Sequence, residues 1–332
     1  MSASQAGNET PTPVLSLIIP VYNERDALPI CLQRIAAVVD TLDISTELVF
    51  IDDGSQDGST DYLLAYTASK PPCSIIRFSR NFGKEAALTA GIDHARGEAI
   101  IILDADLQDP PELIPEMLEQ WHRGVDVVLM QRRTREGESW LKRTSAHLYY
   151  RLLQRLSRAS IPVDTGDFRL MSRRAIEALK RLPERNRYMK GLFAWVGMPT
   201  VVLQYDREAR VAGTSKWNYL GLFQLAIEGI TSFSTSPLRW TMFFGFLAAL
   251  IGGLFGIWIM FKAMFFGDPA RGYPSLVSVI TFLGGVQLLA IGIVGEYVGK
   301  TYIESKQRPN YIVRDILELP ESRESNTNDA EA

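Results

Sequence analysis

The sequence predicts an α/β fold followed by a pair of membrane-spanning helices. Short apolar runs alternate with amphipathic stretches from Leu15 onwards, and acidic turns directly follow two of these runs. Two long uncharged apolar runs lie near the C-terminus. Alternation of strand and helix favours a parallel sheet covered on both faces. In such sheets ligands bind beyond the carboxyl ends of the strands, where the acidic turns fall.

Five strands and three helices are predicted in the first 131 residues. The apolar runs that predict strands are 15–23, 47–52, 73–79, 98–106 and 125–131. Helical spacing of apolar residues covers 27–42 and 84–95. Pro110-Pro111 is expected to open a third helix, because proline is favoured in the first helical turn.

A basic amphipathic helix is predicted over Ser139–Arg158. Tryptophan, tyrosine and leucine side chains there are interleaved with lysine and arginine. This composition is typical of a helix lying in a membrane interface, and equally of a helix packed on a core with a basic outer face. A second, less basic stretch of this kind is Trp217–Phe233.

Two runs are long enough to cross a membrane. Trp240–Phe261 has 22 residues and Ser275–Gly295 has 21, all uncharged. At about 1.5 Å per residue, each can span about 30 Å of hydrocarbon. The short linker 262–274 predicts a hairpin. Basic residues flank the hairpin on its terminal side, which favours a multi-pass protein of the cell inner membrane with both termini and the α/β domain cytoplasmic: Arg239, Lys300, Lys306, Arg308 and Arg314.

The expected organisation has five parts. A polar leader, residues 1–13, contains no basic residue and no apolar run of the kind found in signal peptides. The α/β domain covers 14–215. An amphipathic helix and linker, 216–236, precede the hairpin at 237–298, and a cytoplasmic tail follows at 299–332.

Composition excludes some classes of protein. Hydrophobic residues make up 46% and charged residues 22% of the chain, which is too apolar for a disordered protein. The net charge of −3 gives no indication of nucleic-acid binding. Residues 1–131 hold 8 basic and 20 acidic residues, whereas residues 132–190 hold 16 and 6. The acidic block suggests a cation site and the basic block a surface for anionic lipid or phosphate. The two cysteines have no metal-site spacing.

The strongest chemical signal is Asp104-Ala105-Asp106, directly after an apolar strand. Two carboxylates at this spacing can point the same way and would repel each other without a cation. Hard oxygen ligands in small number suit Mg²⁺ or Mn²⁺ that also binds substrate phosphates. We therefore treat Asp104 and Asp106 as candidate metal ligands, with Gln108 in the same turn.

A second acidic turn, Asp52-Asp53-Gly54-Ser55, also follows a strand. Its carboxylates could hold the ribose or base of a nucleotide, or the turn could be structural, with Asp57 or Ser59 capping the next helix. The third candidate is the run from Pro20 to Glu24 at the end of the first strand.

These sites together resemble the family 2 glycosyltransferases, which have the GT-A fold, a Rossmann-like nucleotide-sugar-binding domain. The resemblance covers about residues 14–313 and rests on the order and spacing of IIPVYNE, IDDGSQDGS, SRNFGKEAALTAG and LDADLQDPPE. The segment GDFRLMSRRA and the two apolar runs resemble the polyprenyl-phosphate branch of that family, which includes bactoprenol glucosyltransferases and dolichyl-phosphate mannose synthases. No Q-x-x-R-W motif is present, which disfavours a processive polysaccharide synthase.

The resemblance implies roles for particular residues. The nucleoside pocket would be lined by Pro20, Tyr22, Glu24, Asp53 and Asp104. Asp106 would be the chief metal ligand, with Gln108 nearby, and Asp167 would lie at the reacting centre. Phosphate handling would fall to Arg132 and to a mobile loop that carries Arg210 and Lys216.

The implied enzyme is a metal-dependent hexosyltransferase that moves one hexose from a nucleotide sugar, most simply UDP-glucose, to undecaprenyl phosphate. GDP-mannose, a UDP-N-acetylhexosamine and a modified arabinose donor remain alternatives, as does a non-catalytic nucleotide-binding membrane subunit. A homo-oligomer is also left open. Single displacement would invert the anomeric carbon, and a lipid phosphate, with a second pKa of about 6, needs little help from a base. Asp167 could therefore accept a proton, position a group, or pair with a neighbouring arginine.

Overall fold

The computed structural model describes residues 12–67, 72–133, 165–206, 231–232, 234–266 and 272–319. The predicted leader up to residue 11, the basic helix at 139–158, most of 217–233, and the candidate residues Arg210 and Lys216 lie outside these ranges. The chain divides into two compact units. One contains the sheet and includes the C-terminal residues from Pro309, and the other contains the two long helices.

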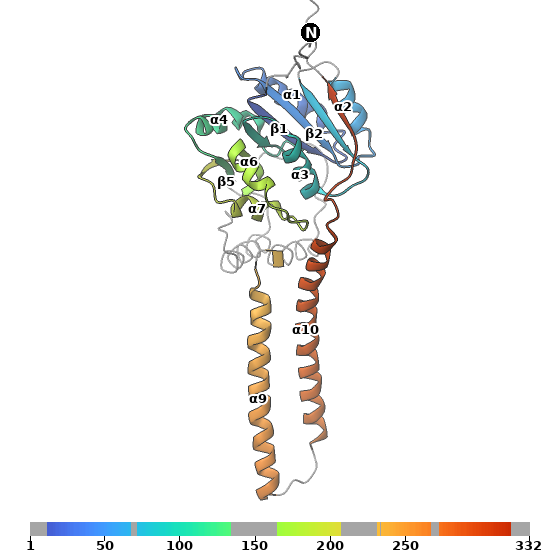
Figure 1. Cartoon of the computed structure of the whole chain (residues 1–332), viewed down its shortest axis with the longest axis vertical. Helices are drawn as coiled ribbons and strands as arrows, with labels where there is room; N and C mark the ends of the chain where they lie inside the picture. Colours follow the sequence, from blue (N-terminus) through green and yellow to red (C-terminus); the bar gives the residue numbers. More distant parts are fainter. Residues whose placement is uncertain are drawn as a thin grey trace, which may run out of the picture. The chain divides into compact units, whose positions relative to one another are not determined.

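The first unit is built on one eight-stranded sheet (Figure 1). The strand order is β7-β5-β6-β4-β1-β2-β3-β8. The strands are β1 (Leu15–Val21), β2 (Thr46–Asp52), β3 (Cys73–Phe78), β4 (Ala99–Ile102), β5 (Val127–Arg132), β6 (Thr165–Ser172), β7 (Thr200–Tyr205) and β8 (Val313–Leu319).

Six short helices complete this unit within the described residues: α1 (Leu28–Val39), α2 (Ser59–Thr67), α3 (Lys84–His94), α4 (Ile114–His122), α6 (Arg173–Lys180) and α7 (Met189–Trp195). A 3-10 turn, η1 (Pro111–Leu113), leads into α4. The two prolines therefore start the helix as predicted, through one turn of tighter geometry.

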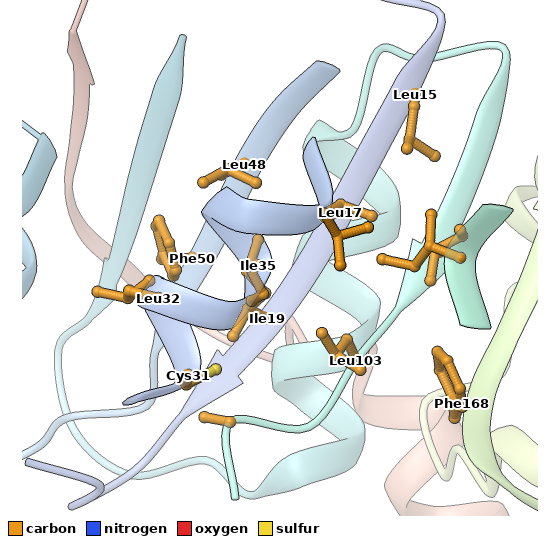
Figure 2. Packing of buried hydrophobic residues seen from close by; sticks show 14 of the residues in the cluster. Leu15, Leu17, Ile19, Cys31, Leu32, Ile35, Leu48, Phe50, Leu103 and Phe168 are labelled. Atoms are coloured by element: carbon orange, nitrogen blue, oxygen red, sulfur yellow. The ribbon is translucent and has the colours of Figure 1, made fainter. Parts of the chain in front are cut away.

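The core confirms that helices cover both faces of the sheet. Leu17 and Ile19 of β1 pack in one cluster with side chains of α1 and α4, as Figure 2 shows for the α1 side. Ile18, between them, faces the other way. A Cβ on Gly91 of α3 would lie 2.3 Å from the Ile18 Cγ2, so glycine allows α3 to lie close against the sheet there. Successive side chains of β1 therefore point to opposite faces of the sheet, and both faces are buried.

The five predicted strands are confirmed, and they run in one direction. The complete sheet is mixed, because two strands that were not predicted are antiparallel to their neighbours: β6 to β4 and β5, and β8 to β3. Both strands carry charged side chains among apolar ones, so neither forms the continuous apolar run that identifies a buried parallel strand. Residues 313–319, assigned to a tail on sequence grounds, belong to the sheet.

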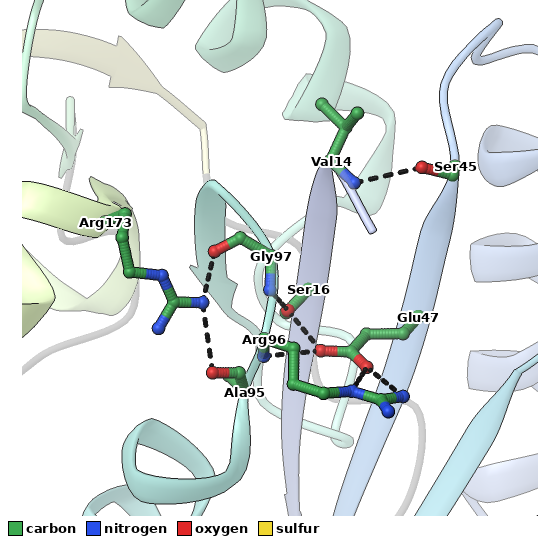
Figure 3. A network of polar contacts seen from close by, with 8 residues as sticks. All are labelled: Val14, Ser16, Ser45, Glu47, Ala95, Arg96, Gly97 and Arg173. Carbon is green, nitrogen blue, oxygen red and sulfur yellow. Dashed lines mark hydrogen bonds and ion pairs between the residues drawn. The ribbon is translucent and has the colours of Figure 1, made fainter. Parts of the chain in front are cut away.

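A polar network fixes the amino-terminal edge of the sheet (Figure 3). The buried carboxylate of Glu47 accepts hydrogen bonds from the Ser16 hydroxyl at 2.6 Å and from the Arg96 backbone N–H at 2.7 Å and guanidinium Nη2 at 2.9 Å. Arg173 donates to the carbonyl of Ala95 at 3.0 Å. Every buried charge here is paired, which marks the network as structural. It lies at the edge opposite the acidic turns.

The second unit contains α9 (Ser236–Phe266) and α10 (Tyr273–Lys306), which run antiparallel to each other. Length and composition would allow Ser236–Trp258 and Phe282–Lys306 to cross a membrane, and neither stretch is buried within the protein. Bulky apolar side chains such as Phe246 and Leu288 are exposed. Both helices extend beyond the predicted apolar runs at each end.

Candidate active site

The carboxyl ends of β1, β2 and β4 bring the predicted acidic turns to one edge of the sheet. These strands are parallel neighbours, with Val21 of β1 in register with Asp52 of β2. The loops that follow them therefore emerge side by side. Asn23 and Leu107 in these loops adopt positive φ values of 55° and 58°, a costly conformation for residues other than glycine. Such strain is concentrated at functional sites.

The loop after β1 is fastened to the loop after β2. The backbone N–H of Asn23 donates to the Ser55 hydroxyl at 3.1 Å, and that of Arg25 donates to the Asp57 carboxylate at 3.0 Å. Asp57 also accepts the N–H of Ser59, the first residue of α2, at 3.0 Å. Asp57 therefore caps the start of α2, which was one of the two interpretations of this turn.

Asp53, in the loop after β2, binds a third loop, which lies between β3 and α3. Its buried carboxylate accepts the backbone N–H groups of Phe82 at 2.6 Å and Gly83 at 2.9 Å. Burial raises the pKa of Asp53, although these two donors oppose the rise. Gly54, with φ of 73°, lets the turn meet this third loop, since a Cβ there would lie 2.8 Å from the Arg80 carbonyl carbon. We name residues 79–84 the lysine loop, after Lys84 at its end.

Lys84 joins the two carboxylates nearest the predicted reaction centre. Its ammonium lies 2.7 Å from the Asp104 Oδ2 and 2.6 Å from the Asp167 Oδ2. The Lys84 side chain is 45% exposed, and its partial burial would lower its pKa, but the two carboxylates outweigh this effect and raise that pKa well above its usual value. The cation thus connects the turn after β4 with β6, whose sequence positions are distant.

Asp167 is held in an ionised state. Burial would raise its pKa, but the charges of Lys84 and Lys190 outweigh burial and lower the pKa well below its usual range. Arg169, two residues along β6, donates to the Gly166 carbonyl at 2.7 Å and stacks over the Phe193 ring at 4.0 Å, which fixes the start of the strand. A carboxylate with a lowered pKa is a weak proton acceptor.

Asp106 is buried in the same turn as Asp104, and its Oδ1 accepts the Gln108 backbone N–H at 3.2 Å. Among the described residues, no group of three or more histidine, cysteine, aspartate or glutamate side chains could hold a metal ion. Two carboxylates from one turn still fit Mg²⁺ or Mn²⁺, because such ions are commonly held by one or two carboxylates and complete their shell with water and substrate phosphate.

Arg132, at the end of β5, lies in a cluster built from four elements. Its guanidinium hydrogen-bonds to the Tyr205 hydroxyl at the end of β7, and that hydroxyl donates to the buried Asp109 carboxylate. A Cβ on Gly166 would lie 3.3 Å from the Arg132 Nη2. Asp109 and Tyr205 therefore orient Arg132 toward the start of β6, where Asp167 lies.

The chain is similar in sequence to known proteins over most of its length. The glycosyl transferase family 2 model matches residues 16–180. The bactoprenol glucosyl transferase of Shigella phage SfV is 48% identical over 301 residues, covering 91% of this chain and 98% of that protein. The chain belongs to glycosyl transferase family 2. The Escherichia coli K12 prophage bactoprenol glucosyl transferase homolog is 46% identical over 302 residues, covering 91% and 99%.

Among solved structures, glucosyl-3-phosphoglycerate synthase of Mycobacterium tuberculosis has a TM-score of 0.49 and 19% identity, covering 66% of this chain and 76% of that one. This likeness is too slight to inform the chemistry. The identity to the phage relative, at 91% coverage of this chain, cannot be confined to the family 2 domain. It must include part of the segment that holds α9, α10 and β8.

The family 2 domain brings four of the predicted site residues to one edge: Asp104, Asp106, Asp167 and Arg132. Pro20, Tyr22 and Glu24 lie at the end of β1, and Asp53 at the end of β2. Tyr22 is 40% exposed. The structure does not describe Arg210 or Lys216.

Sequence reasoning missed Lys84, Asp109 and Tyr205 as members of this glycosyltransferase site. Lys84 and Asp109 stand in the motifs that carried the resemblance, beside residues that were assigned. A lysine following Asn-Phe-Gly in an otherwise acidic half of the chain was the available signal. Tyr205 gave none, because its strand was not predicted.

Glu85, next to Lys84, makes the stability of the enzyme depend on pH. Its carboxylate accepts the Met189 N–H at 2.9 Å, and burial, aided by the charge of Asp167, raises its pKa to about 7. In the unfolded chain that pKa is about 4.3. Between these values the folded protein holds a proton that the unfolded chain has released, so stability falls as pH rises. Glu85→Gln should flatten this decline in urea unfolding between pH 5 and pH 8. The same slope in both proteins would contradict the assignment.

Proposed function

We propose that this family 2 glycosyltransferase moves one glucose from UDP-glucose to undecaprenyl phosphate. The observation that carries the proposal is the meeting of Asp104, Asp106 and Asp167 at one sheet edge, in a chain that continues into two apolar helices. Relatives named bactoprenol glucosyl transferases, at up to 48% identity over nine tenths of the chain, support glucose and a bactoprenol phosphate as the transferred sugar and acceptor.

The nucleotide would lie over the ends of β1 and β2, with Tyr22 against the base and Asp53 and Asp104 near the nucleoside. Asp106 and Asp104 would hold Mg²⁺ or Mn²⁺ together with the diphosphate oxygens. A bound ion of this kind offsets the negative charge that develops on the leaving diphosphate. Lys84 and Arg132 supply fixed positive charge at the same edge, where it acts most strongly because the groups are partly shielded from water.

The acceptor phosphate is the proposed nucleophile. It is largely ionised at neutral pH, so attack requires no strong base. The lowered pKa of Asp167 fits this chemistry, since Asp167 then orients Lys84 and a sugar hydroxyl and accepts no proton. Displacement in one step inverts the anomeric carbon, and an α-linked donor gives a β-linked lipid product.

The chain course supports a membrane hairpin. Strand β7, earlier in the chain than α9, and strand β8, after α10, both belong to the sheet-containing unit, and β8 pairs with β3 along its length. Two crossings would therefore leave this unit on one side of the bilayer. Arg239, Lys300 and Lys306 flank the apolar stretches at that side, as expected for the cytoplasmic face.

The direct test is transfer by the purified full-length enzyme to undecaprenyl phosphate from a panel of donors. UDP-glucose is expected to be the preferred donor, against UDP-galactose, UDP-N-acetylglucosamine, GDP-mannose and a modified arabinose donor. Preference for another sugar would overturn the donor assignment. Metal-dependent binding of UDP without transfer from any donor would instead indicate a non-catalytic subunit.

Metal binding should depend on nucleotide, because no described cluster of protein ligands can hold the ion alone. We expect Mn²⁺ to bind at least about tenfold more tightly with UDP present than without it, and UDP affinity to rise by the same factor with Mn²⁺. Calorimetry measures both, and uridine without phosphates is the matched control. Equal Mn²⁺ affinity with and without UDP would contradict this assignment.

A further inference from the structure

The chain that follows the membrane hairpin returns to the active-site unit next to the lysine loop. We name residues 309–319 the return segment. Its strand β8 pairs with β3 from Cys73–Leu319 to Phe78–Val313, with a register shift beside Phe78. The Ile312 carbonyl then accepts the backbone N–H of Ser79, the first residue of the lysine loop, at 3.0 Å. Backbone pairing thus continues into that loop.

Tyr311 contacts both elements that border the lysine loop. Its ring stacks on the Phe78 ring of β3 with centroids 5.1 Å apart and an angle of 14° between the planes. Its hydroxyl donates to the Asp93 Oδ2 of α3 at 2.9 Å. The loop between β3 and α3 starts directly after Phe78 and ends in Lys84, the first residue of α3. Tyr311 therefore contacts the loop's start directly and contacts α3 at Asp93, near the other end of that helix.

The contacts continue from Tyr311 to Lys84 without a break. The Phe78 ring meets the Phe82 ring edge-on with centroids 5.7 Å apart. The N–H groups of Phe82 and Gly83 are held by Asp53, and Gly83 precedes Lys84. The lysine loop is therefore held by hydrogen bonds to Asp53 and by the ring contacts that lead from Phe82 through Phe78 to Tyr311.

We propose that the return segment supports the active site from outside it, through Tyr311, which is a positioning residue for Lys84. A strand supplied from beyond the hairpin provides this support, so residues before the hairpin are insufficient for full activity. An ion pair between Arg77 of β3 and Asp315 of β8, at 3.2 Å, helps to set the register between these two strands. The catalytic part of this proposal rests on the proposed function, whereas the ordering of the loop does not.

Two variants of the full-length protein separate ordering from general stability. Tyr311→Phe keeps the ring stack and loses the hydroxyl bond to Asp93, and Tyr311→Ala loses both. Glu318→Ala, at an exposed position of the same strand, is the matched control. Hydrogen exchange of the peptide containing residues 79–84 reports on the loop whether or not the enzyme transfers glucose.

Tyr311→Ala should speed exchange in the lysine loop while β1 and β2 keep wild-type protection, and should lower kcat by about tenfold with KM for the donor changed less. Tyr311→Phe should restore kcat to within about threefold of wild type, and Glu318→Ala should match wild type. Unchanged exchange in the loop with Tyr311→Ala would overturn the proposal. So would an equal loss of protection throughout the sheet, because that is general destabilisation. Faster loop exchange in a protein without transferase activity would leave the ordering role intact and remove the proposed function.

Discussion

Lys84→Met should lower kcat/KM for transfer by about a hundredfold or more, because a charged donor fixed in an active site contributes about 3 kcal/mol. The substitution removes the cation that lies within 2.7 Å of both Asp104 and Asp167. Asp104 and Asp167 would then lose the cation that they share, and the pKa of Asp167 would rise toward its ordinary value. The loss should fall mainly on kcat, since Lys84 acts on developing charge and on the position of Asp167.

Lys84→Arg is the matched control, because it keeps the charge but changes its shape and reach. It should retain more activity than Lys84→Met. The pH dependence of kcat distinguishes this role from a purely structural one, because a residue that only stabilises the fold would not change the shape of that dependence. With Lys84→Met, kcat should acquire a new acidic limb as Asp167 begins to titrate nearer neutrality. Wild-type kcat/KM in Lys84→Met would remove Lys84 from the mechanism.

Asp106→Asn should abolish metal-dependent transfer, with a loss of about a thousandfold or more expected for a lost ligand to a catalytic ion. The side chain is buried and the change preserves its shape, so the protein should still fold. The Gln108 N–H can still donate to the amide oxygen. The coupling between Mn²⁺ and UDP should disappear in the same variant. Asp26→Asn, an exposed carboxylate of the loop after β1, should leave both properties unchanged.

Normal turnover by Asp106→Asn in the presence of metal would contradict the ligand assignment. Loss of turnover with retained coupling between Mn²⁺ and UDP would place Asp106 elsewhere in the mechanism. Thermal unfolding of the variant in detergent excludes a folding defect as the cause, because a folded variant should unfold within a few degrees of wild type.

The strands that could be predicted from the sequence are those that form short, local runs of apolar residues. Strands β1 to β5 follow from short runs in which apolar residues predominate, as in Ala99–Ile102. Strand β6 was not predictable in this way, because Asp167 and Arg169 interrupt its apolar pattern. Arg169 is nevertheless buried. The carbonyls of Gly166 and Asp167 accept its hydrogen bonds and the Phe193 ring lies against it, which makes its burial tolerable. Such partners are set by tertiary structure and leave no periodicity in the sequence.

The residues of the candidate site likewise fall into those that the sequence predicts and those that it does not. Asp104 and Asp106 were predictable since they directly follow a strand, and parallel strands end at one edge. Lys84 was not, because its role depends on the insertion of β6 between β4 and β5, which brings Asp167 beside Asp104. The return segment was assigned to a tail because charged residues interrupt the apolar residues of Val313–Leu319, so no continuous apolar run predicted a strand there.

The central claim is that a divalent ion held by the turn after β4 allows one glucose to pass from a nucleotide to a lipid phosphate. The most direct measurement is single-turnover transfer from UDP-glucose to undecaprenyl phosphate by the full-length enzyme in bilayer nanodiscs, with and without Mg²⁺ or Mn²⁺. The account predicts a metal-dependent burst of β-linked glucosyl lipid and stoichiometric UDP. Transfer at the same rate in excess chelator, or an α-linked product, would contradict it.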